Sequence, residues 1–533
     1  MLRSRIALLS VADKTGIDEF ARRLIDLGWS IVASPGTARF LHGKEIPAVS
    51  LEDYTGISPI LGHRVFSEHF KIAGALVAES TPEHDQDRET HDIPWFDLIC
   101  VDLYPLSKAI AEASSEAQVI ESTDIGGVTL IRNAVKGRRI VLTDISDRQE
   151  VLELLEKEDD IPEAFRRRLW YQAEALCADY CLQSAQYLGG NAIDGFVARR
   201  GQELRYGENP YQSDATYYRV SDEALALHNF PRLSGTQPSF VNMTSLSNLV
   251  DSLARLCRVF SRNYGGRVPN IAIGAKHGIA VGAAVDWEST EKALKKMLWS
   301  SPVTIWGGEV ITNFKISGVG AGILQADTER KSKLGSANWM LDIIAAPEFE
   351  ESAIELLGKK EKRRILQNPA LENPDFTSGY VYRYVRGGFL RQPVPDYIPD
   401  IQELEWIGKP LFGSDLDTLL LAWAIAWSMP MNGIAVAGNG QLLAADGQPS
   451  SVGAVQSCVV KMADTGHDTI KNVFAANAFL PFIDSAELFT NNRAYAGILP
   501  GGGVREQEIR QYFSAKGVTL AFVPEKYRGF AHH

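Results

Sequence analysis

Cysteine, long apolar runs and basic tracts are all scarce in this sequence of 533 residues. Its five cysteines are odd in number and include no CxxC pair, which argues against a disulfide framework and against a zinc site. The longest apolar runs, such as IALLSVA and LLLAWAIAW, are too short to span a bilayer, and the N-terminal stretch has no signal-peptide cleavage site. We therefore expect a reduced, cytoplasmic protein that binds neither membrane nor metal.

An excess of positive charge is also missing, because the formal net charge is −12 and the pI is about 5.5. No basic run is interleaved with aromatic residues, so nucleic acid is not an expected partner. Apolar residues at 45% and charged residues at 23% indicate an ordinary globular composition. The chain is too long for a single hydrophobic core and predicts about three or four structural units.

The first 150 residues alternate short apolar runs with helical segments such as TGIDEFARRLIDLG. Near-continuous apolar strands that alternate with helices are typical of a doubly wound parallel sheet, which is an α/β fold. The segment 147–195 has apolar residues at helical spacing and predicts helices. The expected strands are 5–12, 29–34, 74–79, 97–105 and 139–144.

The region after residue 200 also has an α/β pattern. The run SLSNLVDSLARLCRVF predicts a helix and NIAIGAKHG a strand, and two further α/β stretches cover roughly 295–365 and 415–533. A connection rich in proline, glycine and tyrosine separates these two stretches. The sequence has no short-period internal repeat.

The stretch LRYGENPYQ (204–212) between the two regions predicts a bent loop. Pro210 has no N–H and biases Asn209 toward extended geometry, and Gly207 offers a positive φ. The loop also carries Arg205 and Tyr206, whose planar side chains suit a planar ligand. It is either a linker that docks onto a surface or a binding loop.

Two turns at the expected carboxyl ends of neighbouring strands have the composition of a phosphate cradle. They are SVADK (10–14) and SPGTA (34–38), and α/β sheets bind ligands at this edge. Small hydroxyl residues, glycine and helix N-termini there can bind phosphate, although Ser34 and Thr37 can equally cap a helix. The candidates are Ser10, Lys14, Ser34, Gly36 and Thr37.

Two further stretches carry groups suited to acid–base chemistry. The run TDIGGVTLIRNAVKG (123–137) has Asp124 before a Gly-Gly turn and puts Arg132 and Lys136 on one helix face, toward phosphate or toward solvent. The run IAIGAKHG ends in Lys276 and His277, and a neutral imidazole beside an ammonium can act as a base near pH 7. Surface placement of this pair is the alternative.

Taken in order, these stretches resemble the bifunctional purine-biosynthesis enzymes that combine AICAR transformylase with IMP cyclohydrolase. The resemblance runs the whole length of the chain, and RYGENPYQ and the Asp-Ile-Gly-Gly run are its most specific motifs. The full set is LLSVADKTG, LEDYTG, DLYP, DIGGVTLIRNAVK, LRYGENPYQ, AKHG, GGEVITN, PGGGVREQEI and FAHH.

The resemblance implies a methylglyoxal-synthase-like cyclohydrolase domain over residues 1–196. It implies a transformylase region over 197–533, made of two cytidine-deaminase-like units without zinc at about 197–375 and 376–533. Family members resemble obligate homodimers with transformylase sites built across the subunit interface. The implied substrates are an AICAR-like ribonucleotide and the co-substrate 10-formyltetrahydrofolate, and no metal is implied.

The resemblance also assigns roles to particular residues. Arg205 and Tyr206 would bind the carboxamide and 5′-phosphate of the acceptor, while His277 removes the amino proton and Lys276 stabilises the developing charge. The implied catalytic residues are Lys276, His277, Asn432, Asp124, Tyr104 and Lys136. The implied substrate-binding residues are Arg205, Tyr206, Ser10, Lys14, Ser34, Gly36, Thr37, Arg64, Ser67, Gly126, Gly127, Gly307, Gly308 and Arg528. The implied folate-binding residues are Asp342, Asn477, Phe479 and Pro481.

The sequence departs from the family pattern at several positions. Phe66, in VFSEHF, replaces a lysine that helps to close the ring, so weak cyclohydrolase activity is expected. Ser451 stands where a phosphate-binding arginine is usual, and Asn477 stands where the family has aspartate. The family's Asn-Pro-Cys-Gly after the Lys-His pair is IAVG here, its Lys-Ser-Asn is PMN, and its Arg-His-Phe-Arg-His is YRGFAHH.

Three functions remain open, because function resides in sites rather than in folds. The first is formyl transfer to AICAR with weakened cyclisation, in de novo purine biosynthesis. The second is a recruited paralogue that acts on another amine or heterocycle, or uses another one-carbon or acyl donor. The third is a catalytically silent partner that binds purine nucleotide, and the retained Lys276, His277 and Arg205 argue against it.

Overall fold

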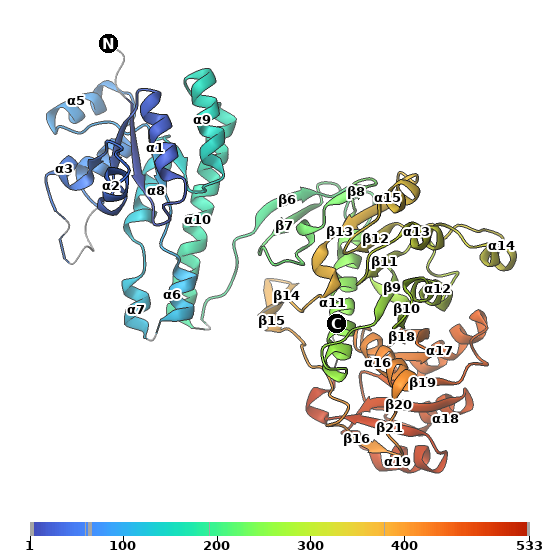
Figure 1. The fold of residues 1–533 in the computed structure, drawn as a ribbon. Coiled ribbons are helices and arrows are strands. Elements are labelled where there is room, and N and C mark those ends of the chain that lie inside the picture. The colour runs from blue at the N-terminus through green and yellow to red at the C-terminus, as the bar shows by residue number, and fades with distance from the viewer. Residues whose placement is uncertain are drawn as a thin grey trace. The chain divides into compact units, whose positions relative to one another are not determined.

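The computed structural model describes residues 5–58, 60–61, 67–113, 115–190, 192–377 and 379–529. Arg64 and Phe66, both singled out above, lie outside the described residues. The chain divides into two units, Met1–Ala198 and Arg199–His533 (Figure 1).

The N-terminal unit contains a five-stranded sheet in the order β3-β2-β1-β4-β5. Its strands are β1 Ile6–Ser10, β2 Ser30–Ala33, β3 Val49–Ser50, β4 Leu98–Val101 and β5 Ile140–Leu142. All neighbouring strands are parallel, which confirms the predicted parallel sheet. The predicted strand at 74–79 is wrong, because residues 74–77 complete helix α4 (Phe70–Val77). Ile72, Ala75 and Leu76 bury one face of this helix, and a short apolar run does not distinguish a buried helix from a strand.

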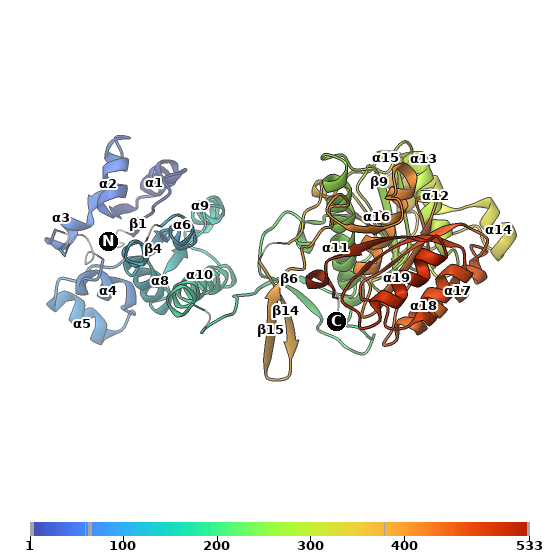
Figure 2. The same cartoon turned by 90° about the horizontal axis from the view of Figure 1, so that it is seen from below.

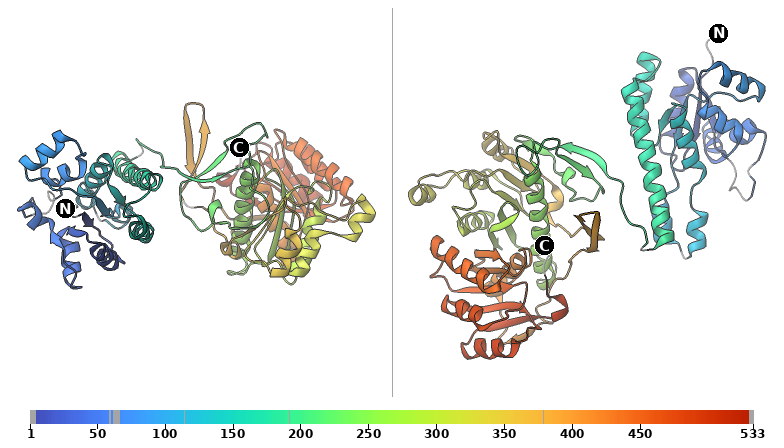
Figure 3. Two further views of the ribbon diagram at one scale, coloured as in Figure 1. Left: turned by 90° about the horizontal axis from the view of Figure 1, so that it is seen from above. Right: turned by 180° about the vertical axis from the view of Figure 1, so that it is seen from behind.

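Helices cover both faces of this sheet. They are α1 Ile17–Asp26, α2 Pro35–His42, α3 Leu51–Thr55, α4, α5 Pro82–Thr90, α6 Leu106–Glu112, α7 Glu116–Glu121, α8 Gly126–Lys136, α9 Asp147–Glu158 and α10 Glu163–Gly189. Alternate strand residues point to opposite faces, so Leu9 packs with α1 and α9 whereas Leu8 packs with α4, α8 and α10. Figure 3 shows the long helix α10 running along this unit. The sheet is therefore doubly wound, as predicted.

The C-terminal unit contains a twelve-stranded sheet in the order β16-β21-β20-β19-β17-β18-β10-β9-β11-β12-β13-β8. Its strands are β8 Arg232–Ser234, β9 Asn270–Lys276, β10 Ile279–Asp286, β11 Glu309–Thr312, β12 Ile343–Ala346, β13 Arg364–Gln367, β16 Glu405–Ile407, β17 Gly433–Gly438, β18 Gln441–Gly447, β19 Asn472–Ala476, β20 Ala494–Pro500 and β21 Thr519–Val523. Two separate hairpins are β6 Arg199–Glu203 with β7 Thr216–Arg219, and β14 Tyr380–Val385 with β15 Gly388–Pro393. The second hairpin projects from its unit (Figure 2).

The helices of the C-terminal unit form two layers around this sheet. They are α11 Phe240–Asn263, α12 Thr290–Ser300, α13 Gly318–Gln325, α14 Thr328–Leu334, α15 Glu351–Gly358, α16 Gly413–Trp427, α17 Ser451–Thr465, α18 Ile483–Asn491 and α19 Glu506–Ala515, with 3-10 turns at Leu227–Asn229, Pro369–Glu372 and Glu525–Tyr527. The long helices α11 and α16 share one core layer with residues from both ends of the sheet. On the other face, α12, α13 and α15 pack on one half, and α17, α18 and α19 on the other. No helix in the described ranges is long and apolar enough to cross a membrane.

The same succession of elements occurs twice in this unit. The series β8-α11-β9-β10-α12-β11-α13-β12-α15-β13 is matched by β16-α16-β17-β18-α17-β19-α18-β20-α19-β21, with α14 as an addition in the first half. The halves join where β10 and β18 pair antiparallel at Ala284 and Gln441. This join places the amino ends of β11, β12 and β13 at the same sheet edge as the carboxyl ends of β19, β20 and β21. We call this edge the shared edge.

Candidate functional site

The two predicted phosphate turns of the N-terminal unit lie side by side after β1 and β2. Thr37 is fully buried, and its Oγ1 accepts a hydrogen bond from the Val11 N–H at 3.3 Å and donates to the Val11 carbonyl at 3.2 Å. Ser34 Oγ donates to Thr37 Oγ1 at 3.1 Å. Thr37 therefore joins the two turns, while Gly36 is exposed in the first turn of α2.

The turn after β1 is held by internal contacts. Lys14 Nζ donates to the carbonyls of Val11 and Ala12, and burial lowers the pKa of Lys14 while Asp102 and Asp13 raise it. The Asp102 carboxylate, just after β4, accepts the N–H groups of Ala12 and of Asp13, the latter at 2.9 Å. The sequence reading missed Asp102, because nothing in the local pattern links residue 102 to residue 12.

Asp124 lies before the first turn of α8. Its Oδ1 accepts the Gly127 N–H at 2.7 Å, and the Tyr180 hydroxyl accepts the Asp124 N–H at 2.7 Å. Burial raises the pKa of Asp124. A Cβ on Gly127 would lie 2.6 Å from Asp124 Oδ2, and a Cβ on Gly126 would clash with Ser67 Oγ. The Gly-Gly pair therefore allows both side chains to approach the helix, and Tyr180 is a neighbour that the sequence reading missed.

The other residues expected to assist cyclisation are less closely grouped. The side chain of Tyr104 is 62% exposed, although its backbone N–H approaches Asp124 and lowers the pKa of that carboxyl. Lys136 is exposed and ends α8, about 15 Å along the helix axis from its first residue. Arg132 forms an ion pair of 3.5 Å with Glu174 on α10. The backbone thus does not bring Lys136 close to Asp124.

The loop 204–212 of the C-terminal unit is bent, as predicted, and Gln212 closes it. The Gln212 carbonyl accepts the Gly207 N–H at 2.8 Å, and its Oε1 accepts the Asn209 N–H at 2.8 Å. The positive φ expected at Gly207 is wrong. Glycine is needed there for close approach instead, because a Cβ would lie 2.8 Å from Gln212 Cβ.

Arg205 and Tyr206 are held at the start of α11. The Arg205 N–H donates to the Pro238 carbonyl at 2.9 Å, and the Tyr206 carbonyl accepts the Phe240 N–H at 3.0 Å. The Arg205 guanidinium lies 5.7 Å from the centre of the Tyr206 ring and is exposed. Burial lowers the pKa of Arg364, and Arg205 contributes to lowering it further. Arg205 and Tyr206 therefore lie near Arg364, which begins β13 at the shared edge.

Lys276 ends β9, and His277 lies in the tight turn that leads into β10. His277 has a φ of 53° and Gly278 a φ of 76°, as two-residue hairpin turns require. Asn439 at 55° and Gly440 at 69° occupy the matching turn of the second half. The His277 side chain is exposed. The turn therefore requires a residue that tolerates positive φ at position 277, independently of any catalytic role.

The Gly-Gly pair of IWGG makes room for Lys276. Lys276 Nζ donates to the carbonyl oxygens of Trp306 at 2.7 Å and Gly307 at 2.8 Å. Gly307 has a φ of 67°, and a Cβ there would lie 2.7 Å from Lys276 Nζ. A Cβ on Gly308 would clash with the Ala275 carbonyl. An ammonium has three N–H donors, so one remains beyond these two bonds.

Charged residues stand at the starts of the strands beside Lys276. Glu309 begins β11, Asp342 precedes β12, and Arg364 begins β13. Burial raises the pKa of Glu309 to about 7, although Lys276 lowers it. Burial also raises the pKa of Asp342, while Arg364 and Lys276 lower it. The sequence reading missed Glu309 and Arg364, although an acid at the head of the apolar strand EVIT was a usable signal for the first.

Asn477 is fully buried and bonded to backbone. Its Oδ1 accepts the Gly433 N–H at 2.7 Å, and its Nδ2 donates to backbone carbonyls. Asn313 occupies the matching position of the first half, and its Oδ1 accepts the Ile271 N–H at 2.7 Å. The two asparagines therefore tie equivalent strands together in both halves.

The remaining predicted residues of the second half lie around the ends of its strands. Asn432 has a φ of 49°, and its Nδ2 donates to the carbonyls of Gln448 at 3.0 Å and Pro449 at 2.9 Å. The Arg528 guanidinium lies 5.6 Å from the centre of the Phe479 ring. Pro481 is half-buried. Ser451, which stands where the family has an arginine, is buried at the start of α17.

The residues expected to carry transformylase chemistry thus gather at the shared edge. The first half contributes Lys276, His277, Gly307, Gly308, Asp342 and, through the loop before α11, Arg205 and Tyr206. The second half contributes Asn432, Asn477, Phe479, Pro481 and Arg528. Strands β10 and β18 separate β9 from β17, so the groups containing Lys276 and Asn432 are neighbours along one edge without direct contact.

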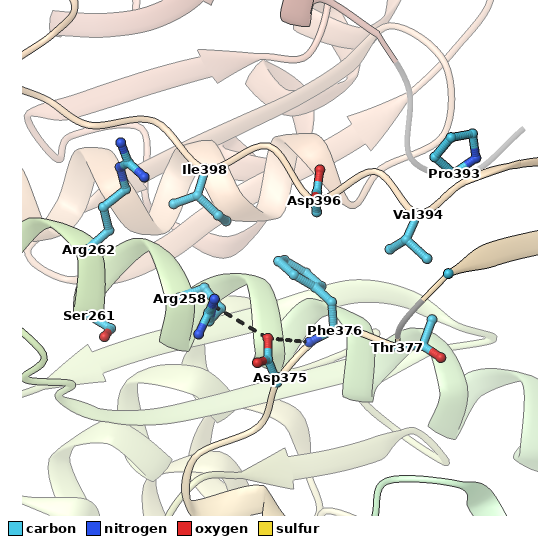
Figure 4. A pocket seen from close by; sticks show the side chains of 11 residues that line it. Arg258, Ser261, Arg262, Asp375, Phe376, Thr377, Pro393, Val394, Asp396 and Ile398 are labelled. Atoms are coloured by element: carbon cyan, nitrogen blue, oxygen red, sulfur yellow. Dashed lines mark hydrogen bonds and ion pairs between the residues drawn. The ribbon is translucent and has the colours of Figure 1, made fainter. Parts of the chain in front are cut away.

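A cavity of about 550 Å³ lies elsewhere in this unit, between the C-terminal part of α11 and the segment 375–398 (Figure 4). Arg258 and Asp375 form an ion pair of 3.5 Å at its wall, and Phe376 lies beside them. Arg262, another lining residue, pairs with Asp400 at 3.6 Å. None of the predicted site residues lines this cavity.

Comparison with known proteins identifies the family. A family model described as AICARFT/IMPCHase bienzyme matches residues 137–461, and a model described as MGS-like domain matches residues 16–129. A solved structure titled "Crystal structure of ForH" is 29% identical, with coverage of 35% of this chain and 99% of that chain and a TM-score of 0.32. The bienzyme model spans more than half of the chain and confirms the resemblance drawn from its motifs. This chain therefore belongs to the AICARFT/IMPCHase bienzyme family and carries an MGS-like N-terminal domain.

Proposed function

We propose that this protein transfers the formyl group of 10-formyltetrahydrofolate to the 5-amino group of AICAR or of a closely similar ribonucleotide. Membership of the bienzyme family supports the reaction class. The observation that carries the proposal is the gathering of Lys276, His277, Arg205 and Asp342 at one edge of the twelve-stranded sheet. Residues 1–196 would act as the cyclohydrolase domain and residues 197–533 as the transformylase region.

The proposed chemistry uses the exposed hairpin turn. The acceptor nitrogen attacks the formyl carbon, and His277 removes its proton as the new N–C bond forms. Lys276, with a donor beyond its two carbonyl bonds, stabilises the oxyanion. Asn432 lies three strands from Lys276 along the shared edge, so its contact with the formyl group would require the site across the subunit interface that the family resemblance implies. The bond from the formyl carbon to folate N10 then breaks, and N10 takes up a proton. Arg205 and Tyr206 bind the acceptor, while Asp342 binds the folate.

A substitution that preserves the turn tests the role of His277. His277→Asn retains the residue type that occupies the matching turn of the second half. We expect tetrahydrofolate release to fall at least about 10²-fold, with acceptor binding changed only a few fold. His91→Ala, which removes an exposed histidine of the N-terminal unit, serves as the control. Near-normal turnover of His277→Asn would exclude His277 as the base.

We also propose that the N-terminal unit binds a 5′-phosphorylated nucleotide and closes the inosinate ring slowly. The two turns joined by Thr37, with Ser10, Lys14, Ser34 and Gly36, support a phosphate cradle. Asp124 and Tyr104 would carry the remaining cyclisation, with Ser67, Gly126 and Gly127 beside them, whereas Lys136 lies too far along α8 to act beside Asp124. Calorimetric titration should show that the unmodified chain binds inosinate and that Lys14→Met binds it more weakly. Equal affinity of the unmodified chain and Lys14→Met would exclude the proposed phosphate site.

The recruited paralogue is favoured by one observation at the shared edge. Ser451 is buried where the family resemblance implies an arginine. Asn477 stands where the resemblance implies an aspartate, and its side chain hydrogen-bonds to backbone groups. Two charges that would contact ligands are therefore replaced by neutral groups. An assay with a panel of amines and acyl donors decides between the two readings, because a recruited paralogue would prefer an acceptor other than AICAR.

A further inference from the structure

Arg330 is a buried arginine without an acidic partner among the described residues. It lies on α14 and is 4% exposed. Burial lowers the pKa of its guanidinium, and no carboxylate acts in the opposite direction. Arginine is rarely buried to this extent unless an acid pairs with it, because the guanidinium loses its hydration. The position of Arg330 therefore calls for another explanation.

The Arg330 guanidinium joins two loops. Its Nη2 donates to the Pro302 carbonyl at 3.3 Å, and its Nη1 donates to the Ser336 carbonyl at 2.7 Å. Its central carbon lies 5.2 Å from the centre of the Trp306 ring and 5.0 Å from the centre of the Trp339 ring. A cation is attracted to an aromatic ring at such distances. Arg330 therefore ties the loop after α12 to the loop after α14.

The loop after α12 is also the cradle of Lys276. Lys276 Nζ donates to the carbonyls of Trp306 and Gly307. Trp306 thus gives its carbonyl to Lys276 and its ring to Arg330. The Gly307 N–H donates to the Met340 carbonyl, in the loop after α14, at 2.8 Å. The cradle is therefore fixed by a backbone hydrogen bond and by the Arg330 side chain.

The helix that carries Arg330 occurs in the half of the unit that has the lysine. Helix α14 has no counterpart among the described elements of the second half. There, β17 ends in Gly438 at the position that corresponds to Lys276 at the end of β9. The added helix and the lysine hairpin therefore occur together.

We propose that Arg330 is a positioning residue for Lys276, a role that rests on the formyl transfer proposed above. Through the Trp306 ring and the Pro302 carbonyl, Arg330 holds the loop after α12 in the conformation that presents two carbonyl oxygens to the ammonium. The remaining N–H donor of Lys276 is then fixed where the oxyanion develops.

The reactivity of Lys276 tests this role without any turnover. In the full chain, competitive acetylation at about pH 8 is followed by mass spectrometry, with the exposed Lys359 as the internal reference. We expect Arg330→Met to raise acetylation of Lys276 at least about threefold, because a loosened cradle no longer favours the ammonium. Loss of a positive charge alone would lower it, since that favours the charged form of a nearby lysine. The control Lys331→Met, at an exposed position of the same helix, should change nothing.

Trp306→Leu supplies a second variant if Arg330→Met does not fold. It removes the ring that Arg330 contacts and keeps the carbonyl that binds Lys276, at a position that is 44% exposed. We expect it to raise acetylation of Lys276 at least about twofold. The double variant should show less than the product of the two single effects, because both substitutions remove one contact.

The transfer assay separates positioning from substrate binding. Arg330→Met should lower kcat about tenfold and keep KM within about threefold, because the ammonium is misplaced while the acceptor and folate contacts remain. Lys331→Met should retain the kcat of the unmodified chain.

Unchanged or lowered acetylation of Lys276 in Arg330→Met or Trp306→Leu, or independent effects of the two substitutions, would overturn the positioning role. A chain that transfers no formyl group to any acceptor, while Lys276 still responds to the substitution of Arg330, would remove the proposed function and leave the hold on Lys276 in place. The two ideas can therefore fail separately.

Discussion

We expect Glu309 to make the stability of the C-terminal unit fall as pH rises. Its pKa is raised from 4.5 to about 7 in the folded chain, so the folded state binds the proton more tightly. The resulting stability is fully present below pH 4.5 and is lost as pH rises through about 7. We expect the free energy of unfolding of Glu309→Gln, relative to the unmodified chain, to increase by about 3 kcal/mol between these limits.

Denaturant unfolding at a series of pH values measures this difference. Glu355→Gln, on the exposed face of α15, is the matched control and should follow the unmodified chain at every pH. Parallel stability curves for Glu309→Gln and the unmodified chain would show that the buried acid does not titrate in this range.

A substitution at Phe66 tests the proposed cyclisation by the N-terminal unit. A phenyl ring can neither donate a proton nor stabilise an anion, so we expect Phe66→Lys to raise cyclisation of formyl-AICAR by about 10²-fold. Phe70→Lys is the control, because Phe70 is 58% exposed at the start of α4. Cyclisation is followed by absorbance, and a high rate in the unmodified chain would mean that another group has replaced the lysine.

The β9–β10 hairpin turn restricts position 277 to residue types that tolerate a positive φ. Positive φ is tolerated by asparagine and histidine but is strained for a β-branched residue. We expect His277→Val to lower the free energy of unfolding by about 1–2 kcal/mol, and His277→Asn to leave it nearly unchanged. Asn439→Val, in the matching turn, should lose a similar amount. Equal stability of the valine and asparagine variants would show that the turn adapts.

At the scale of the whole molecule, the β14–β15 hairpin exposes large apolar side chains. Its Tyr384 is 80% exposed and its Leu390 60% exposed, and it pairs with no strand beyond its own two among the described residues. Isolated two-stranded hairpins are marginally stable in water. We propose that a second copy of the chain covers it in a homodimer, as is typical of the family.

Sedimentation measures this association. Tyr384→Asp combined with Leu390→Asp should raise the dimer Kd at least about tenfold, because large apolar contacts dominate interfaces. Tyr171→Asp, at a 65% exposed position of α10, is the control. A dimer that is equally tight in the double variant would place the interface elsewhere.

Much of the architecture is determined by local sequence. The short apolar runs of β1, β2, β4 and β5 predict their strands, because burial on both faces requires continuous apolar residues. The family follows from ordered motifs, which are local as well. The strand predicted at 74–79 is wrong because it too was inferred from local sequence, and an apolar segment of this length fits a buried helix equally well.

Only the tertiary structure decided which of these residues meet. The antiparallel join of two matching halves puts Lys276 and Asn432 on one edge, and strand pairing sets Glu309 beside the Lys276 hairpin. The same packing hydrogen-bonds Tyr180 to Asp124 and leaves Lys136 at the far end of its helix. Such contacts depend on burial and pairing between residues far apart in the chain, and these are properties that no local pattern encodes.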